Sequence, residues 1–295
     1  MPLVPLRPVL DATVKYGYAQ GAFNVNAVAQ AEAVIAVHEM FRSPAILQGA
    51  DLANAFMGGR VDFANGTLED KKKGARNIAE AVKKFAEQSP IPVVLHLDHG
   101  KNFDSCVAAI EGGYTSVMID GSSLPFEENV ELTRKVVEYA HAHGVVVEGE
   151  LGKLAGIEDD VNVSADDANF TQPEEVEDFV SRTGVDSLAI AIGTSHGAYK
   201  FKPGQKPQLR FDILAEVAEK LPGFPIVLHG ASSVMPEYVK MINEFGGEMP
   251  DAIGIPEEML RKAASMAVCK INVDSDIRLA MTASIRKHFA EYPSH

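Results

Sequence analysis

The sequence predicts an α/β fold of the (β/α)8 class, a TIM barrel, from three observations. Eight short apolar segments are spread over the 295 residues, and most are continuous apolar runs rather than alternating ones. Continuous runs are typical of strands that are buried on both faces of a parallel sheet. Helical patterns separate these segments, and no composition break or flexible linker divides the chain. We therefore expect a single TIM-barrel domain over residues 1–295.

The expected strands and helices alternate along the chain. In order, the strands are "GAFNV" (21–25), "AILQG" (45–49), "VVLHLDH" (93–99), "SVMID" (116–120), "VVVEGEL" (145–151), "SLAIAIG" (187–193), "PIVLHGAS" (225–232) and "KINVDSD" (270–276). Between them, the clearest helical patterns cover 27–40, 127–144 and 255–267. Gly144 is a stop signal for the second of these helices, and Pro256 is expected at the first position of the third.

One connection is too long and too polar to be a simple link between a strand and a helix. Residues 152–174, "GKLAGIEDDVNVSADDANFTQPE", are rich in acidic side chains. Loops of this length within a compact domain are usually either functional or disordered. We expect a mobile active-site loop at about 152–174.

Composition and charge exclude several classes of function. The net charge of −14 opposes non-specific attraction to nucleic acid or to an anionic membrane surface. With only two cysteines, Cys106 and Cys269, the chain can form neither a disulfide framework nor a multi-cysteine zinc site. Three prolines interrupt the apolar N-terminus, and no apolar run approaches the roughly 18 residues of a membrane span. We expect a cytoplasmic protein with no nucleic-acid partner and no membrane partner.

Polar and ionisable residues stand where the expected strands end. They are Asp98 and His99 on the third strand, Asp120 on the fourth, Glu150 on the fifth, His196 on the sixth, His229 on the seventh, and Asn272, Asp274 and Ser275 on the eighth. The carboxyl ends of the strands form the active site of a TIM barrel. Three histidines at three strand ends can converge, and neutral imidazoles suit zinc with one coordination position left open. The joint placement therefore favours a metal site, although any one histidine alone would favour a structural role.

Two adjacent residues of the third strand pose a geometric problem. Strict alternation points Asp98 and His99 to opposite faces, so both can join one site only if the strand bends where it ends. His96 lies inside the same strand, and we expect it to be a packed core residue. The remaining histidines fall in helical or terminal positions and are expected at the surface.

Glycines form a second group at the strand ends. Gly193 and Gly197 flank His196, while Gly230 follows His229 and Ser232 lies just beyond it. Glycine lets backbone N–H groups approach an anion closely, and the later strands of such barrels often bind phosphate. Lys200 and Arg278 add positive charge close behind two of these strand ends.

Six motifs resemble those of a known enzyme family, and they occur in the family's order. They are "LHLDHG", "SVMID", "ELGKLAGIED", "AIGTSHGAYKF", "VLHGAS" and "KINVDSD". Together they resemble the class II, zinc-dependent fructose-1,6-bisphosphate aldolases, from "GYAQGAFNVN" to the last residues. The absence of a large insertion is similar to the shorter, B-type subgroup.

The resemblance implies a Zn²⁺ cofactor and the residues that hold it. His99, His196 and His229 would bind the catalytic zinc. Asp120 and Glu150 would either bind a second divalent ion or orient the zinc ligands.

The resemblance also implies an acid–base pair and a set of substrate contacts. Asp98 would exchange a proton with the C4 hydroxyl, and Glu158 would move the proton at C3 of the dihydroxyacetone phosphate part. The phosphate of that part would be held by Gly197, Gly230, Ser232, Asp274 and Ser275, beside a monovalent cation (Na⁺ or K⁺). Asn272 would contact its hydroxyl, Asn24 would be a further substrate contact, and Arg278 would contribute to the distal phosphate.

The implied activity is the reversible cleavage of fructose 1,6-bisphosphate to dihydroxyacetone phosphate and glyceraldehyde 3-phosphate, in a homodimer or homotetramer. Two departures from the family pattern concern the distal phosphate. Ala50 stands where relatives usually have serine, and relatives continue past "EYPSH" into an Asp-Pro-Arg stretch that reaches a neighbouring subunit's substrate. Tagatose bisphosphate therefore stays open as the substrate.

Three other readings compete with this one. A Schiff-base aldolase needs a buried strand lysine, for which Lys270 is the only fair candidate. A hydrolase of the amidohydrolase kind would want His-x-His on the first strand, and "GAFNV" has no histidine. A non-catalytic zinc-binding scaffold would need neither Asp98 nor Glu158.

Overall fold

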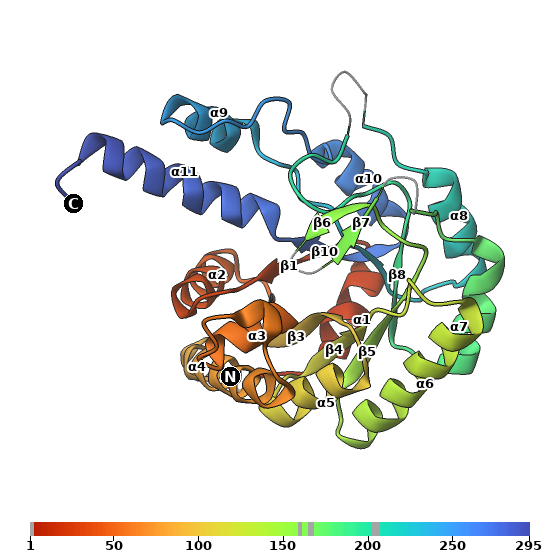
Figure 1. Ribbon diagram of the computed structural model, residues 1–295. Coiled ribbons are helices and arrows are strands. Elements are labelled where there is room, and N and C mark those ends of the chain that lie inside the picture. The colour runs from red at the N-terminus through yellow and green to blue at the C-terminus, as the bar shows by residue number, and fades with distance from the viewer. Residues whose placement is uncertain (1–2, 159–160, 165–167, 202–206) are drawn as a thin grey trace.

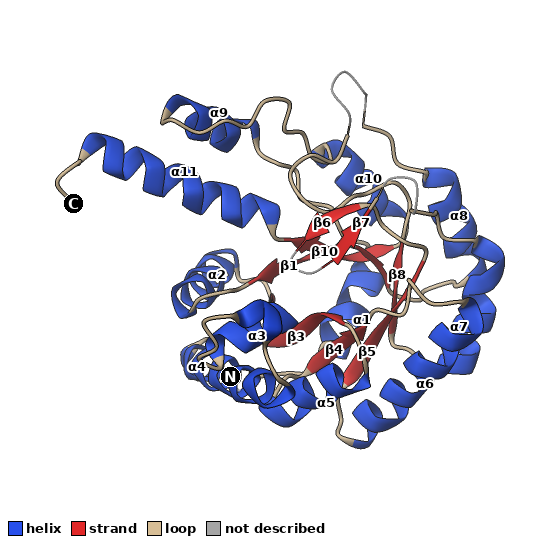
Figure 2. Cartoon of the chain, in the orientation of Figure 1, coloured by secondary structure: helices blue, strands red, loops and turns tan. Residues whose placement is uncertain are grey.

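A computed structural model describes residues 3–158, 161–164, 168–201 and 207–295, without the side chains of 157–158 and 161–162. Eight parallel strands close into a barrel in the order β1–β10–β9–β8–β5–β4–β3–β2 (Figure 1). Helices surround this barrel (Figure 2). The predicted (β/α)8 fold is thereby confirmed.

The barrel strands correspond to the eight apolar runs. Their bounds are β1 (Gln20–Asn24), β2 (Ala45–Ala50), β3 (Val93–Gly100), β4 (Ser116–Ile119), β5 (Val146–Leu151), β8 (Ser187–Ile190), β9 (Ile226–Leu228) and β10 (Val268–Val273). β8 and β9 end before the expected residues. Gly193 and Gly230 have positive φ angles, which is incompatible with continued strand pairing.

The helices are α1 (Arg7–Tyr16), α2 (Val28–Phe41), α3 (Asp51–Met57), α4 (Leu68–Gln88), α5 (Phe103–Gly112), α6 (Phe126–Ala142), α7 (Val176–Thr183), α8 (Phe211–Lys220), α9 (Pro236–Glu244), α10 (Glu257–Met266) and α11 (Ser275–Glu291), with 3₁₀ turns η1 (Phe63–Asn65) and η2 (Pro173–Glu175). Most of the helices surround the barrel, whereas α1 covers the strand starts and α11 extends away from the barrel (Figure 1). The expectation that Pro256 is the first residue of α10 is wrong. Pro256 immediately precedes the helix and has an extended ψ of 136°. Among the described residues, no helix is long and apolar enough to cross a membrane.

The inside of the barrel changes from apolar to polar along the strands. Near the strand starts, Ile46, Val94 and Cys269 form a buried cluster with Leu6 and Leu10 at the start of the chain. The apolar cluster therefore closes this end of the barrel.

Farther along the barrel the inward positions are polar. Gln48 and His96 lie two residues after Ile46 and Val94 and so share their face, whereas Lys270 follows Cys269 directly, where the pairing of β10 with β9 shifts register. Gln48, His96, Glu148 and Lys270 are all fully buried there. The site residues at the strand ends lie above this polar layer.

The long connection after β5 contains regular structure. Strands β6 (Gly156–Glu158) and β7 (Val161–Val163) pair in antiparallel fashion, and both appear in front of the barrel strands in Figure 1. The backbone of Ala155 pairs with Ser195, and the N–H of His196 donates to the carbonyl of Ala155 at 2.9 Å. The connection is thus fastened to the segment that follows β8. Residues 159–160 and 165–167 of the expected loop lie outside the described residues.

Candidate active site

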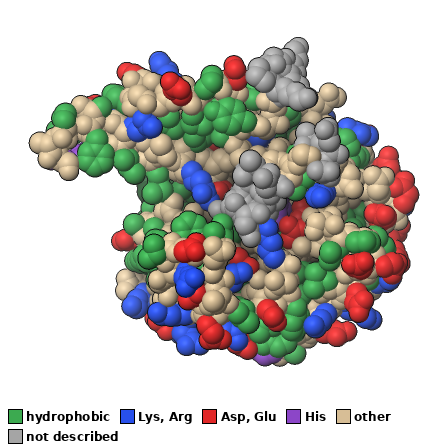
Figure 3. Space-filling model, in the orientation of Figure 1, with side chains coloured by type: hydrophobic (Ala, Val, Ile, Leu, Met, Phe, Trp, Pro, Cys, Tyr) green, Lys and Arg blue, Asp and Glu red, His purple; other side chains and the backbone are tan. Residues whose placement is uncertain are grey.

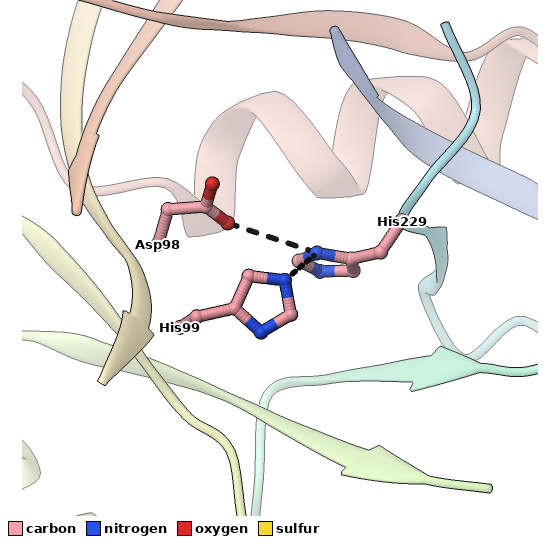
Figure 4. Close-up of side chains that lie close together, drawn as sticks. All are labelled: Asp98, His99 and His229. Carbon is pink, nitrogen blue, oxygen red and sulfur yellow. Dashed lines mark hydrogen bonds and ion pairs between the residues drawn. The ribbon is translucent and has the colours of Figure 1, made fainter. Parts of the chain in front are cut away.

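The end of β3 carries an irregularity that brings Asp98 and His99 to the same side. The pairing of β3 with β4 shifts register between Leu97 and Gly100, and His99 has a φ of 48°. A bulge of this kind re-aims a side chain, and it holds His99 in a conformation that is uncommon for non-glycine residues. Figure 4 shows Asp98 and His99 both directed toward His229. The bend that the sequence required is present.

The imidazoles of His99 and His229 face each other at the centre of the site. The Nε2 atom of His99 lies 3.0 Å from Nδ1 of His229, and Oδ1 of Asp98 lies 3.7 Å from the same Nδ1 atom. Among the described residues, the groups arranged to hold a metal are Asp98–His99–His229 and His99–Asp120–Glu150. His196 belongs to neither group, but its ring packs edge-to-face on His99 with centroids 5.1 Å apart.

Acidic neighbours determine the charge of His99. Burial lowers its pKa, but the hydrogen bond to Asp120, at 2.9 Å, and the charges of Asp98 and Glu150 together raise the pKa well above its usual value. Burial lowers the pKa of His229. Nδ1 of His99 donates to Asp120, and its Nε2 atom is directed at Nδ1 of His229.

The same position suits a metal ion. Zinc binds imidazole nitrogens at about 2.0–2.1 Å with tetrahedral angles, which separates two such nitrogens by about 3.3 Å. The observed 3.0 Å between the two nitrogens is close to this value. Oε2 of Glu150 is buried without a hydrogen-bond partner, and burial together with the charge of Asp120 raises its pKa well above the usual value. The donor set fits a divalent cation.

Two amides hold the carboxylate of Asp98. Asn24 donates from Nδ2 to Oδ2 at 2.8 Å, and Asn272 donates to Oδ1 at 3.1 Å. Gln48 donates to the oxygen of Asn24 at 2.5 Å, which fixes the direction of that amide. Asp98 is therefore a buried, oriented carboxylate beside the candidate metal position.

Glycine is required at two backbone positions beside the histidines. Gly230 has a φ of 58°, and a Cβ there would lie 2.6 Å from the carbonyl carbon of Ser195. Gly197 has a φ of 79°. The segments after β8 and β9 therefore approach each other more closely than side chains would allow.

The start of α11 offers polar groups at the end of β10. The backbone N–H of Asp274 donates to Oγ of Ser232 at 3.2 Å, and Nε of Arg278 donates to Asp274 at 2.6 Å. Ser275 is the first residue of α11, a helix of 17 residues. Unpaired N–H groups at a helix start favour anions. The start of α11 is therefore suited to an anion.

Two cavities adjoin these residues. One, of about 980 Å³, lies between residues 153–156 and 193–201 and is lined by Ser195 and Lys200. Lys200 is buried and donates from Nζ to the carbonyl of Ser195. A smaller cavity of about 250 Å³ opens over His99 and His196. Figure 3 shows Lys and Arg side chains near the middle of this face, so the approach is suited to an anionic ligand.

Two further residues adjoin the site. The sequence did not indicate Glu148, and it indicated Lys270 only as the candidate for a Schiff-base lysine. Glu148 accepts a hydrogen bond from Nε2 of His229 at 2.7 Å. Lys270 lies 3.1 Å from the other oxygen of Glu148. Period-two alternation could have found both, because Glu148 lies two residues before Glu150 and Lys270 two before Asn272.

His96 is buried as expected, but only one of its ring nitrogens is hydrogen-bonded. Nδ1 contacts Oγ of Ser116 at 2.8 Å, whereas Nε2 has no hydrogen-bond partner and lies 3.9 Å from Glu148. Burial and the charge of Lys270 lower the pKa of His96 to about 3, so its ring is neutral. Glu158 ends β6, and its side chain lies outside the described part of the structure.

Fold and site together define a (β/α)8 barrel in which histidines and carboxylates that could hold a metal ion lie at the carboxyl ends of the strands. The model of the family "Fructose-bisphosphate aldolase class-II" matches residues 4–295. This chain belongs to the class II fructose-bisphosphate aldolases, which are zinc-dependent carbon–carbon lyases.

Relatives and solved structures agree with this assignment. A fructose-bisphosphate aldolase of Treponema pallidum is 53% identical over 299 residues, spanning 97% of this chain and 86% of the relative. One of Giardia intestinalis is 45% identical, spanning 99% and 85%. Among structures, the YdjI aldolase of Escherichia coli K12 has a TM-score of 0.72 at 29% identity, covering 99% of this chain and 89% of that one. Fructose-bisphosphate aldolase of Campylobacter jejuni has a TM-score of 0.73 at 25% identity, covering 99% and 83%.

Proposed function

We propose that the protein reversibly cleaves fructose 1,6-bisphosphate to dihydroxyacetone phosphate and glyceraldehyde 3-phosphate, with Zn²⁺ as its cofactor. The observation that carries this proposal is the convergence of Asp98, His99 and His229 inside the barrel of a class II aldolase chain. His99 and His229 would hold the zinc together with His196, whose ring adjoins that of His99.

Cleaving the C3–C4 bond requires a base at the C4 hydroxyl and stabilisation of charge on the departing triose. When bound, zinc would supply the second as a Lewis acid at the C2 oxygen. Asp98 would take the hydroxyl proton as the bond breaks and return it in condensation. The amides of Asn24 and Asn272 hold the Asp98 carboxylate in place through hydrogen bonds.

The second proton transfer is assigned to Glu158. Glu158 is the last residue of β6, which begins directly after Ala155. The carbonyl of Ala155 accepts a hydrogen bond from the N–H of His196. Glu158 would protonate C3 of the triose, and closure of residues 152–174 as a mobile loop would exclude water from the reacting atoms. The motion of this loop and the role of Glu158 stay predictions.

The substrate and further ions would occupy the rest of the strand ends. The triose phosphate would bind at Gly197, Gly230, Ser232, Asp274 and Ser275, beside Na⁺ or K⁺. Asn24 and Asn272 would contact hydroxyl groups, and Lys200 and Arg278 would balance phosphate charge. Asp120 and Glu150, which approach His99 from its other side, would serve a second divalent ion.

We also propose that the active form is a homodimer or homotetramer in the cytoplasm. Met281, Ile285 and Phe289 are exposed along α11, and Tyr292 is exposed just after it; this helix extends away from the barrel in Figure 1. Such a stripe of apolar side chains is typical of subunit contacts. Both described cysteines are free and buried, as a reducing compartment allows.

Metal removal tests the proposed function. A chelator should abolish the cleavage of fructose 1,6-bisphosphate, and added zinc should restore it. Tagatose 1,6-bisphosphate, the alternative substrate that Ala50 leaves open, should be assayed in parallel. Full activity after verified removal of all metal would contradict the proposal, and zinc binding without cleavage of either sugar would favour a non-catalytic scaffold.

A further inference from the structure

A fully buried ion pair lies beneath the candidate metal residues. Glu148 of β5 and Lys270 of β10 have no exposed surface, and Oε2 of Glu148 lies 3.1 Å from Nζ of Lys270. Charges in a protein interior are costly to desolvate and are tolerated only when they are paired and hydrogen-bonded. Well-packed apolar residues would fill the same space at no such cost. The remaining contacts of the two side chains show what the pair does.

Glu148 contacts the metal-site face of the barrel through His229. Its Oε1 atom accepts from Nε2 of His229 at 2.7 Å. A neutral imidazole carries its proton on one nitrogen only, so a carboxylate acceptor at Nε2 keeps the proton there. Nδ1 is then the electron-pair donor, and Nδ1 is the nitrogen that faces His99 (Figure 4).

Lys270 contacts the amide that serves Asp98. Its Nζ atom donates to Oδ1 of Asn272 at 2.7 Å. Because the amide oxygen is engaged, the amide nitrogen must point to the other side, where it lies 3.0 Å from Nδ1 of His229 and 3.1 Å from Oδ1 of Asp98. The orientation of Asn272 therefore depends on Lys270.

We propose that Glu148 and Lys270 form a positioning pair for the aldol reaction. Glu148 sets the tautomer and ring orientation of His229, and Lys270 sets the amide of Asn272 and through it the carboxylate of Asp98. The proposal rests on the proposed function in taking His229 as a metal ligand. Carboxylates that accept from the second nitrogen of a ligating histidine typically change metal affinity by about 10–100-fold.

A double-variant cycle separates positioning from simple charge balance. Glu148→Gln and Lys270→Met each leave one buried charge unpaired, so each should lower both the unfolding midpoint and the zinc affinity. The double variant has no unpaired charge and should recover most of the midpoint. Its zinc affinity, measured by competition with a chromophoric chelator, should stay about 10–100-fold below that of the wild type.

A control removes a buried carboxylate elsewhere. Asp51 is buried and pairs with Lys71 at 2.8 Å, on helices outside the barrel. Asp51→Asn should lower the unfolding midpoint without changing zinc affinity. This variant shows whether lost stability alone weakens metal binding.

Nitrogen NMR of the zinc-free protein reads the tautomer directly. With ¹⁵N-labelled histidine, His229 should carry its proton on Nε2 in the wild type and show a population protonated on Nδ1 in the double variant. A wild-type His229 protonated on Nδ1, or a double variant with wild-type zinc affinity, would overturn the positioning pair. Because the NMR measurement needs neither zinc nor substrate, its outcome is independent of the chelation test of the proposed function.

Discussion

Hydrogen bonds divide the site residues into those held as acceptors and those held as donors. Asp98 accepts N–H groups from Asn24 and Asn272, so both of its carboxyl oxygens are held as acceptors. His99 instead donates to Asp120, which leaves Nε2 directed at the metal position. Asp98 and His99, adjacent residues of β3, are thus held differently, the first as a hydrogen-bond acceptor and the second as a donor.

This division predicts different losses from two substitutions. Asp98→Ala should keep its zinc but lose roughly 10²–10⁴-fold in turnover, the usual contribution of a positioned acid or base. His196→Ala should instead lower metal affinity. Metal content by atomic absorption and turnover at saturating zinc separate the two effects. A metal-free Asp98→Ala protein would mean that Asp98 is a ligand.

Glu158 is expected to move the proton at C3, whereas Asp98 acts at the C4 hydroxyl. Glu158→Ala should slow the exchange of the C3 proton of dihydroxyacetone phosphate far more than it weakens phosphate binding, because the phosphate contacts come from other strand ends. Solvent deuterium incorporation measured by NMR checks the rate, and inhibition by the ketone phosphate checks its binding. Normal exchange in this variant would transfer the role to Asp98 or to water.

At the scale of elements, close helix packing carries a constraint that helix propensity does not show. Gly74 lies within α4, and a Cβ at this position would be 1.6 Å from the backbone oxygen of Asn54 in α3. The absence of a side chain lets the two helices touch through their backbones.

We expect Gly74→Ala to destabilise the protein by at least about 2 kcal/mol, as overpacking does. This sign is opposite to that of helix propensity, which favours alanine over glycine by about 1 kcal/mol. Glu80→Ala on the exposed side of the same helix is the control and should be nearly neutral. Urea unfolding measures both, and a stabilised Gly74→Ala protein would show that α3 and α4 can separate without loss.

The sequence predicts a strand or helix correctly where the local pattern of apolar residues alone determines that element. Short apolar segments, most of them continuous runs, located all eight barrel strands, because strands of a parallel sheet are buried on both faces. The bulge at His99 was not predictable, since it depends on pairing with β4 rather than on local sequence. The β6–β7 pair lies in a polar segment without strand alternation, so only the structure reveals it.

The site was predictable where residue type alone indicated chemistry. Histidines and carboxylates at strand ends pointed to the metal residues, and the resemblance added Glu158. Glu148 lies two residues before Glu150, so alternation places it on the same face, but its role depends on contacts with Lys270 and His229 that only the structure shows. Contacts between distant strands, not composition, give such residues their roles.

For the whole molecule, the buried polar layer decides between two kinds of aldolase chemistry. An imine mechanism needs a lysine that meets the substrate carbonyl, and Lys270 is fully buried and bonded to Asn272 below the site. Borohydride added with substrate should therefore leave activity intact, and mass spectrometry should find no adduct. A triose adduct on Lys270 with loss of activity would contradict the metal mechanism.

The apolar cluster of Leu6, Leu10, Ile46, Val94 and Cys269 closes the barrel at the strand starts. The described part of the structure therefore leaves the carboxyl ends of the strands as the side from which the histidines are reached. We expect both products of cleavage to leave by that side, so an accumulated product should compete with the next substrate for the same space.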